Sequence, residues 1–498
     1  MTYRAPDMQE ILSLIFEAAD QAVLARAAQC CKAFSNPALD VLWRDLPTPE
    51  PLRKLLPVRF DRHGGLPNDV FVRDDQCVRF TEYARRVQYI RTTSNLYLLR
   101  LSRGSPWNFS FIFQIAHLLP GHMSFPKLRN LTLEEHGRCD VSLNIIIPPT
   151  LRDLTLIRLN PMAPGRSPLQ VAVCQAPLLQ SLTIAGEMPW IYVPYIARFK
   201  YLTAIFLQDM RLDGNPEDVN RVYHDLIRDL SHRRLAILVL PLDLTYDAIP
   251  RDVTSLHLKE LRTSNIPSII RAFLDVLAPG KLATFRCRDP SLVARNEWRT
   301  CFDSVRQRCG SSLRTLNVKI QTADDGLSAM ETIQPLLEIH GLEHVTLLMF
   351  PTASSDEVKA MASAWPYLTS FRLGNEWGHE GRTSCPLQGL VDLCYSCPRL
   401  ITLVMRISDD LSDMDLDSLP ALSHGLQSLT LHVPDDTNHV LLARVLDKLF
   451  PSLQTLTVHP GEQQLRQAPP AVSAFEDVLQ MLKAFQAIRD ECRSGILR

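Results

Sequence analysis

The sequence is short of glycine, of long apolar runs and of net charge. Only 19 of its 498 residues are Gly, and it contains neither a G-x-G-x-x-G fingerprint nor a Walker-type phosphate loop. No stretch of about 18 consecutive apolar residues occurs, so we expect no membrane-spanning helix. Lys and Arg number 53 against 54 Asp and Glu, which gives a net charge of −1. Such a chain has no overall field that would attract nucleic acid or a membrane surface, and we expect neither partner.

Recognisable catalytic motifs are also missing. The sequence contains no G-x-S-x-G and no H-E-x-x-H. The run His340-Gly341-Leu342-Glu343-His344 matches the H-x-x-E-H pattern of one class of zinc peptidases, a chemistry that needs both His on one helical face. Gly341 interrupts a helix at this point, so we expect no metal site here.

The pair Cys394-x-x-Cys397, with Cys385 upstream, is the other candidate metal motif. It lacks a second pair at zinc-finger spacing and ends an apolar helical pattern that begins near Leu387, so it favours buried thiols. We therefore predict no catalytic residue, no metal and no cofactor, and a protein that is not an enzyme.

The 12 Cys are scattered through the chain. The opening MTYRAPDMQEILSLIF lacks a basic segment ahead of a long apolar run, which argues against a secretory leader. We expect free thiols in a reducing compartment, the cytoplasm or the nucleus.

Leucine is abundant, with 77 residues, and much of it falls in a repeated pattern. Apolar-x-x-apolar-x-apolar recurs 13 times, with first residues about 27 positions apart, a period within the leucine-rich-repeat range. The copies are Leu128-Leu131-Leu133, Leu151-Leu154-Leu156, Leu179-Leu182-Ile184, Leu202-Ile205-Leu207, Leu235-Leu238-Leu240, Val253-Leu256-Leu258, Leu282-Phe285-Cys287, Leu313-Leu316-Val318, Leu342-Val345-Leu347, Leu368-Phe371-Leu373, Leu400-Leu403-Met405, Leu426-Leu429-Leu431 and Leu453-Leu456-Val458.

Each copy predicts a short strand, because its last two apolar positions are spaced as on one face of a strand. Helical spacing lies between copies, at residues 217–230, 266–277, 297–308, 354–364 and 438–450. One strand–helix unit cannot bury its own apolar face, so neighbouring units must stack, with parallel strands inside and helices outside. We predict an α/β fold, a leucine-rich-repeat solenoid with degenerate repeats that lack the usual Asn ladder. A doubly wound α/β domain is the alternative, but it favours longer strands and a Gly-rich first turn.

The first 46 residues follow a different pattern. Asp7 with Glu10 predicts a capped first helix, Asp20 caps a second helix that extends through Phe34, and Pro37 starts a third helix that extends to Leu46. Three helices of this size bury too little surface to be stable alone, so something must cover their remaining apolar face. Without a family resemblance, a cap on the end of the repeats would be an equally good interpretation.

The N-terminal residues carry a family resemblance. Ala5-Pro6-x-x-x-Glu10-Ile11-Leu12-x-x-Ile15-Phe16, Leu24-Ala25-Arg26-Ala27, Cys30 to Phe34, and Pro37 to Leu46 resemble the F-box motif, most closely the form in fungal F-box proteins with a following leucine-rich-repeat-like region. Two positions differ from the usual motif: Ala5 stands where Leu is usual, and Phe34 where Trp is frequent.

The resemblance implies that this module binds the Skp-type adaptor, and through it the cullin, of an SCF-type cullin–RING ubiquitin ligase. The adaptor-binding residues that it implies are Pro6, Ile11, Leu12, Ile15, Leu24, Phe34, Leu42 and Trp43. It further implies that the repeats bind a target protein, which makes the chain the substrate-recognition subunit. A leucine-rich-repeat scaffold without a ligase role is the alternative.

The sequence divides into four segments. Residues 1–46 form the trihelical F-box-like module, and residues 47–85, rich in Pro, form a connector with little regular structure apart from a short helix near 52–56. Residues 86–460 form the repeats, after an additional copy at Val87-Ile90-Thr92, and residues 461–498 form a linker and an amphipathic helix that caps the last repeat.

Basic residues gather at the predicted outward strand positions of the middle and later repeats. Acids at such positions are rare, Glu134 and Asp153 alone. This segregation favours a target that is acidic or phosphorylated, because Arg makes charge-assisted bonds to such groups. The candidate target-binding residues are Lys259, Arg286, Arg288, Lys319, Arg372 and Arg406.

Overall fold

The computed structural model describes residues 5–46, 50–55, 74–90, 125–134, 146–157, 168–207, 210–241, 244–253, 256–323, 326–349, 353–374, 385–407, 422, 424–433, 437–459 and 472–494. The chain divides into two compact units, Met1–Pro250 (unit 1) and Arg251–Arg498 (unit 2).

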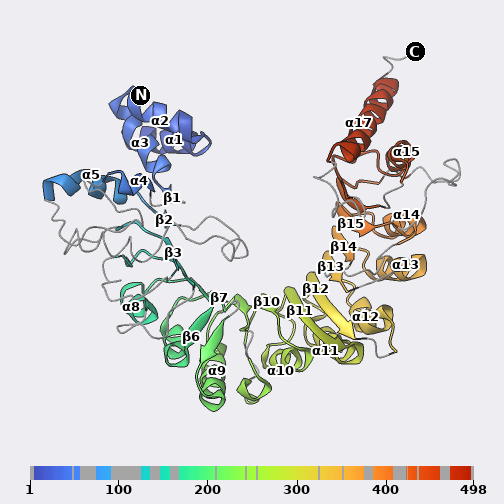
Figure 1. Ribbon diagram of the computed structural model, residues 1–498, viewed down its shortest axis with the longest axis horizontal. Helices are drawn as coiled ribbons and strands as arrows, with labels where there is room; N and C mark the ends of the chain where they lie inside the picture. The colour runs from blue at the N-terminus through green and yellow to red at the C-terminus, as the bar shows by residue number, and fades with distance from the viewer. Residues whose placement is uncertain are drawn as a thin grey trace. The chain divides into compact units, whose positions relative to one another are not determined.

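Unit 1 begins with helices and continues as parallel strands. Its strands β1, β2, β3, β4, β5, β7 and β9 pair in that order, all parallel, and β6 and β8 form a separate parallel pair (Figure 1). Its elements are α1 Ala5–Glu17, α2 Gln21–Cys30, α3 Lys32–Leu42, β1 Asp45–Leu46, α4 Glu50–Arg53, α5 Asp74–Ala84, β2 Tyr89–Ile90, β3 Asn130–Glu134, β4 Asp153–Ile157, α8 Pro168–Gln175, β5 Ser181–Ala185, β6 Glu187–Pro189, the 3-10 helix η2 Trp190–Arg198, β7 Ala204–Phe206, β8 Arg211–Asp213, α9 Pro216–Ser231, β9 Ile237–Val239 and η3 Tyr246–Ala248.

Unit 2 alternates strand and helix. Strands β10 to β17 pair consecutively and in parallel, and the helices α10 to α15 all lie on one side of them (Figure 1). The elements are β10 Glu260–Thr263, α10 Pro267–Val276, β11 Thr284–Ala294, α11 Arg295–Cys309, β12 Thr315–Ala323, α12 Ala329–Leu337, β13 His344–Leu348, α13 Ser355–Ala364, β14 Ser370–Gly374, α14 Leu387–Ser396, β15 Thr402–Arg406, β16 Ser428–His432, α15 His439–Leu449, β17 Thr455–His459 and α17 Val472–Ser494.

The predicted fold class is confirmed: each unit has the leucine-rich-repeat arrangement of parallel strands with helices on one face. In every copy of the apolar pattern but one, the second apolar residue lies within a strand and is buried. Each of the helices predicted between copies is present, as α9, α10, α11, α13 and α15. Among the described helices, none combines the length and the apolar character needed to cross a bilayer.

The exception is Val253-Leu256-Leu258, where the predicted strand is wrong. Strand β10 begins at Glu260, and the repeat positions fall instead on Leu258, Leu261 and Thr263. Thr263 is 4% exposed, and its hydroxyl accepts hydrogen bonds from the backbone and side-chain nitrogens of Asn265, at 3.1 and 3.2 Å. A hydroxyl satisfied in this way can occupy an apolar repeat position, which an apolar pattern does not detect.

Backbone groups keep neighbouring repeats in register at the start of the strands. The carbonyl of the residue before a strand accepts two N–H donors from the next repeat. Arg44 accepts from Gln88 and Tyr89, both at 2.9 Å, and Arg314 accepts from Glu343 and His344, at 2.8 and 3.0 Å. This contact needs no particular side chain, so it tolerates the degenerate repeat sequence.

The helices of the N-terminal module begin and end differently from the predicted ones. The second helix is capped as predicted, with the Val23 N–H donating to Asp20 Oδ1 at 2.7 Å. The first helix starts at Ala5, so Asp7 lies inside it. The third starts at Lys32, because the Cys31 carbonyl already accepts from Phe34 and Ser35, and Pro37 therefore lies inside α3.

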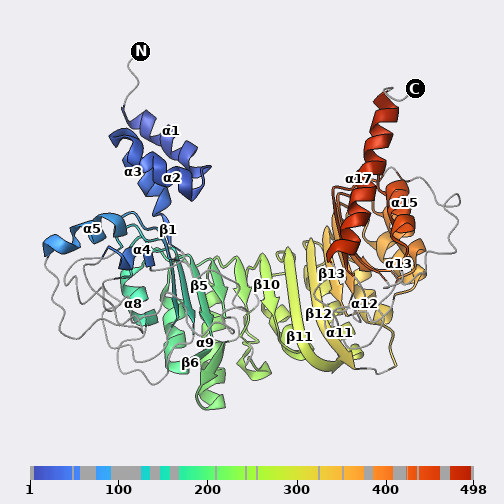
Figure 2. The ribbon, with the colours of Figure 1, turned by 45° about the horizontal axis from the view of Figure 1, so that its top comes forward.

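The segments on either side of the repeats also take up helical structure. In the predicted connector, α5 is an 11-residue helix, where we expected little regular structure. At the far end, α17 packs along α15 and β17 (Figure 2), with Val478 and Leu482 fully buried. The Gln486 side chain donates to the Leu453 carbonyl at 3.0 Å. Helix α17 thus covers the last repeat as a cap.

Candidate functional site

The three-helix module has a small core of its own. Phe16, Leu24, Ala27 and Ala38 are buried, and partly buried residues pack around them: Leu12, Ala19, Ala28, Val41 and Leu42. Figure 2 shows α1, α2 and α3 gathered as one body at the start of unit 1. Because this core is so small, α1 can bury only one of its faces within the module.

A second face of α1 is apolar and exposed. Ile11, Leu14 and Ile15 recur at the helical spacing of neighbours, and their exposed fractions are 54%, 68% and 57%. Large apolar side chains gathered on one exposed helix face mark an interaction surface more often than isolated ones do. We call Ile11, Leu14 and Ile15 the apolar face of α1.

The implied adaptor-binding residues differ in burial. Ile11, Ile15 and Phe34 are exposed, and the Phe34 ring meets the buried Phe16 edge-on, with ring centroids 5.8 Å apart. Leu12 and Leu42 are half-buried at the rim of the core, whereas Leu24 is 4% exposed and lies inside it. Pro6 lies in the first turn of α1, and its side chain is outside the described part of the structure.

Trp43 faces the rest of unit 1. Its ring lies against Tyr83 of α5, with centroids 4.5 Å apart, and it is half-buried there. Leu14, the most exposed residue of the apolar face of α1, is absent from the set that the F-box resemblance implies. A second apolar stripe on the helix, beside the core stripe, was the signal that could have found it.

Polar contacts hold the module on the first repeats. Arg86, just before β2, donates to the Asn36 carbonyl at 3.3 Å and to Asn36 Oδ1 at 2.9 Å, and it forms an ion pair with Asp40. Within the module, Arg44 pairs with Glu17, and β1 at the module's end is hydrogen-bonded in parallel to β2. The module is therefore joined to the sheet of unit 1 by backbone pairing as well as by side chains.

Five of the six candidate target-binding residues lie on strands of unit 2. Side chains alternate between the two faces of a strand, and the buried set faces the helices. Arg286, Arg288, Lys319, Arg372 and Arg406 alternate with this buried set, so they point away from the helices. The strand register places Arg288 directly opposite Lys319.

Lys259 is not part of this arrangement. It precedes β10, and its backbone carbonyl accepts from Ala283 and Thr284, both at 2.9 Å. Lys259 was predicted to lie on the strand because the strand itself was predicted at residues 256–258. For the same reason Arg262, which lies opposite Arg286, and Glu260, an acid on the same face, were not predicted there. We call Arg262, Arg286, Arg288, Lys319, Arg372 and Arg406 the basic strand face.

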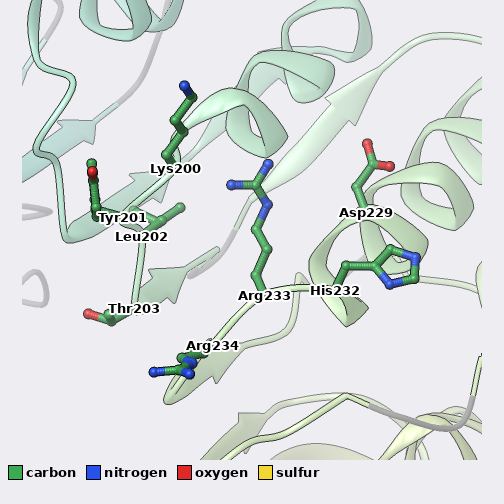
Figure 3. Close-up of a pocket in the computed structure, with 8 residues that line it drawn as sticks. All are labelled: Lys200, Tyr201, Leu202, Thr203, Asp229, His232, Arg233 and Arg234. Atoms are coloured by element: carbon green, nitrogen blue, oxygen red, sulfur yellow. The ribbon is translucent and has the colours of Figure 1, made fainter.

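A shallow depression of about 720 Å³ lies in unit 1 between the start of β7 and the end of α9 (Figure 3). The Arg233 guanidinium at its centre donates to the carbonyls of Phe199, at 2.7 Å, and Ala197, at the end of η2. Arg233 thus satisfies backbone acceptors. The lining residues are Lys200, Tyr201, Leu202, Thr203, Asp229, His232, Arg233 and Arg234.

The metal-like motifs lie apart from any cluster of ligands. His340 is in a turn, with Nδ1 3.0 Å from the Ala364 carbonyl, whereas His344 begins β13, so the two do not share a helix face. Cys394 and Cys397 are buried at the end of α14, and burial raises the pKa of both thiols, that of Cys397 to about 12. Among the described residues, no group of His, Cys, Asp and Glu is placed to hold a metal ion.

Comparisons with known proteins give likenesses of fold. No family model matches the chain, and no curated protein matches it. A chain of the yeast Rad7–Elc1 complex aligns with 69% of this chain and 79% of its own length, at 12% identity and a TM-score of 0.38. For a leucine-rich-repeat protein of Leptospira interrogans the shares are 68% and 79%, at 16% identity and a TM-score of 0.33. The leucine-rich-repeat protein LegL7 of Legionella pneumophila aligns with 71% of this chain and 98% of its own length, at 15% identity and a TM-score of 0.34. Likenesses this weak say nothing about what this chain binds.

Proposed function

We propose that this chain is the substrate-recognition subunit of an SCF-type ubiquitin ligase. Residues 5–46 bind the Skp-type adaptor, and through it the cullin, while the repeats bind a target protein. The chemistry of ubiquitin transfer belongs to other subunits, and the proposal includes a cytoplasmic or nuclear location. The observation that carries it is the apolar face of α1: Ile11, Leu14 and Ile15 remain exposed on a module whose sequence resembles the F-box.

The exposed fractions of the implied residues indicate which of them an adaptor would contact directly. Ile11 and Ile15 can be covered by a partner directly, and Phe34 adds an exposed ring whose inner edge is held by Phe16. Apolar and aromatic side chains at the centre of a desolvated patch carry most of the binding free energy in protein interfaces. Leu24 contributes by keeping the three helices together.

The test is co-purification of the full chain with a Skp-type adaptor. We expect the wild-type chain to form the complex and the double variant Ile11→Asp/Ile15→Asp to bind at least about tenfold more weakly, because two charges would be buried at the interface. Ile488→Asp is the matched control, since Ile488 is 53% exposed on a helix at the other end of the chain. A wild-type chain that does not bind the adaptor, or a double variant that binds like the control, contradicts the proposal.

A leucine-rich-repeat scaffold without a ligase role is the second candidate, and the module's contacts with the repeats favour it. Trp43 packs on Tyr83, and Arg86 ties α3 to the start of β2, as a simple end cap would require. If capping is the module's whole role, Trp43→Ala lowers the stability of unit 1, and Ile11→Asp/Ile15→Asp has no effect on the binding of any partner. Adaptor binding that depends on Ile11 and Ile15 excludes this alternative.

A further inference from the structure

We propose that the basic strand face of unit 2 binds an anionic segment of a protein, with Arg286, Arg288 and Lys319 at its centre. This inference rests on the proposed function in one point, that the repeats bind a target protein, and it adds the chemistry of that target. The anionic group is a run of carboxylates, because the face already holds the Glu260 carboxylate between two guanidinium groups.

The strand register brings the central cations close together. Arg286 and Arg288 are two residues apart on β11 and so point to the same face, about 7 Å apart along the strand. Lys319 on β12 is directly opposite Arg288, at the spacing of about 5 Å between neighbouring strands. These three side chains can therefore reach the oxygens of one anionic group together.

The register also places Arg262 on β10 opposite Arg286 on β11, so cations of neighbouring strands lie side by side at two places on this face.

Glu260 shows how the face holds a carboxylate. Its Oε1 lies 2.7 Å from Nε of Arg262 and 3.1 Å from Nε of Arg286, so one carboxylate oxygen bridges two guanidinium groups. This interaction joins β10 to β11 within the protein. Glu260 therefore competes with any external anion for Arg286.

The rest of the face suits a polypeptide better than a nucleic acid. Further along the face, Arg372 and Arg406 form no ion pair within the described part of the chain. Hydroxyl and amide side chains that can hydrogen-bond a peptide lie on the same face, and the apolar Leu348 and Val404 stand opposite Lys319 and Arg372. The hydroxyl and amide residues are Thr284, Thr315, Asn317, Thr346, Ser370 and Thr402. The described positions of the face carry no Phe, Tyr or Trp on which bases could stack.

The test measures binding of labelled peptides to the full chain by fluorescence anisotropy at about 50 mM NaCl, where surface charges are weakly screened. The probes are a fluorescein-labelled Gly/Ser peptide with two phosphoserines, the same peptide with Glu at those positions, and the unmodified peptide. We expect the Glu peptide to bind and the unmodified one not to bind. Binding of the phosphopeptide without binding of the Glu peptide would overturn the assignment to carboxylates.

Variants locate the site. Arg288→Gln/Lys319→Gln should weaken binding about tenfold or more, because two charge-assisted contacts are lost. Glu260→Gln should tighten binding several-fold, because it releases Arg286 from its internal partner. Arg299→Gln is the matched control: Arg299 lies on α11, on the helical side of the same unit, and donates to Gln334.

The inference is overturned if no anionic peptide binds, or if Arg288→Gln/Lys319→Gln binds like Arg299→Gln. It is also overturned if a labelled single-stranded RNA binds more tightly than the peptides through the same residues, since the partner would then be of another class. Adaptor binding should be unchanged in Arg288→Gln/Lys319→Gln. Loss of peptide binding alone therefore separates failure of this inference from failure of the proposed ligase role.

Discussion

At the scale of single residues, Asp289 of unit 2 is a buried carboxyl with one oxygen that is unsatisfied within the described structure. It is 1% exposed and lies where the register of β11 against β12 shifts between Asp289 and Leu292. Oδ1 accepts from the Ser291 N–H at 2.8 Å, while Oδ2 has no hydrogen-bond partner among the described residues. Burial raises the pKa of this carboxyl above its ordinary value of 3.8, against the opposing effect of the Ser291 hydrogen bonds.

Asp289→Asn should therefore stabilise the protein at neutral pH. The raised pKa means that the folded state binds a proton more readily than the unfolded state, so stability falls as the pH rises from about 4 through the folded-state pKa. Asn removes this cost and can still accept from Ser291. We expect the difference in free energy of unfolding between Asp289→Asn and wild type, from urea titrations, to be positive at pH 7 and to shrink towards pH 4.

Asp213→Asn, at an exposed position, is the control for the loss of one carboxylate. A loss of stability in Asp289→Asn at pH 7 would mean that the ionised carboxylate has a stabilising partner, contrary to this interpretation.

At the scale of elements, α12 and α13 begin with the same capping box. The hydroxyls of Ser328 and Ser354 accept from the N–H groups of Glu331 and Glu357, at 3.0 and 3.2 Å. Each Glu carboxylate in turn accepts from the N–H of the same Ser, at 2.7 Å in both helices. The sequence signature S-x-x-E before an apolar helical pattern marks such a start. The helix predicted at 354–364 from the spacing of its apolar residues agrees with α13, which this capping box begins.

Ser354→Ala should cost about 1 kcal/mol of stability, because the Glu357 N–H loses its acceptor at the helix end. The measurement is the urea midpoint of the transition that involves unit 2. Ser354→Thr should recover most of the loss, and Ser355→Ala, one residue further along, serves as the control. Equal losses for Ser354→Ala and Ser355→Ala would show that the capping bond contributes nothing.

Elements were missed where the local pattern was ambiguous. Thr263 occupies an apolar repeat position with its hydroxyl bonded to Asn265, so the apolar triplet Val253-Leu256-Leu258 matched better than the true strand. Pro37 predicted a helix start, but α3 had already begun at the Cys31 carbonyl. In both cases the position of the element is set by a hydrogen bond that cannot be read from the sequence, and the apolar or Pro pattern pointed to a different position.

At the scale of the whole molecule, the stability of each repeat depends on its neighbours. A stack of repeats is stabilised mainly by contacts between adjacent units, so the apolar surface of each end repeat needs a capping element. In the described structure α17 covers the last repeat through Val478 and Leu482, and Arg489 pairs with Asp447 of α15. The apolar surfaces of α15 and β17 depend on this helix.

Removal of residues 472–498 should unfold the last repeat and leave the earlier repeats of unit 2 largely intact. Hydrogen exchange is the measurement: we expect amide protection to be lost in α15 and β17 and retained in β11 and β12. Ile488→Asp, on the exposed side of α17, should leave protection unchanged. Undiminished protection of α15 in the shortened chain would contradict the role of α17 as a cap.

The sequence by itself determined the repeat, the repeat strands other than β10, the helices α9, α10, α11, α13 and α15, and the class of fold, because these follow from the local spacing of apolar residues. Helices α5, α8 and α12 were not predicted. Only the tertiary structure decided which faces are left open. Leu24 is buried and Ile15 exposed because of how α2 and α3 pack on α1, and Trp43 meets Tyr83 from 40 positions away. The register of β10 and β11 likewise put Glu260 between two arginines. Burial and charge pairing depend on residues distant in the chain, which the periodicity of one segment does not specify.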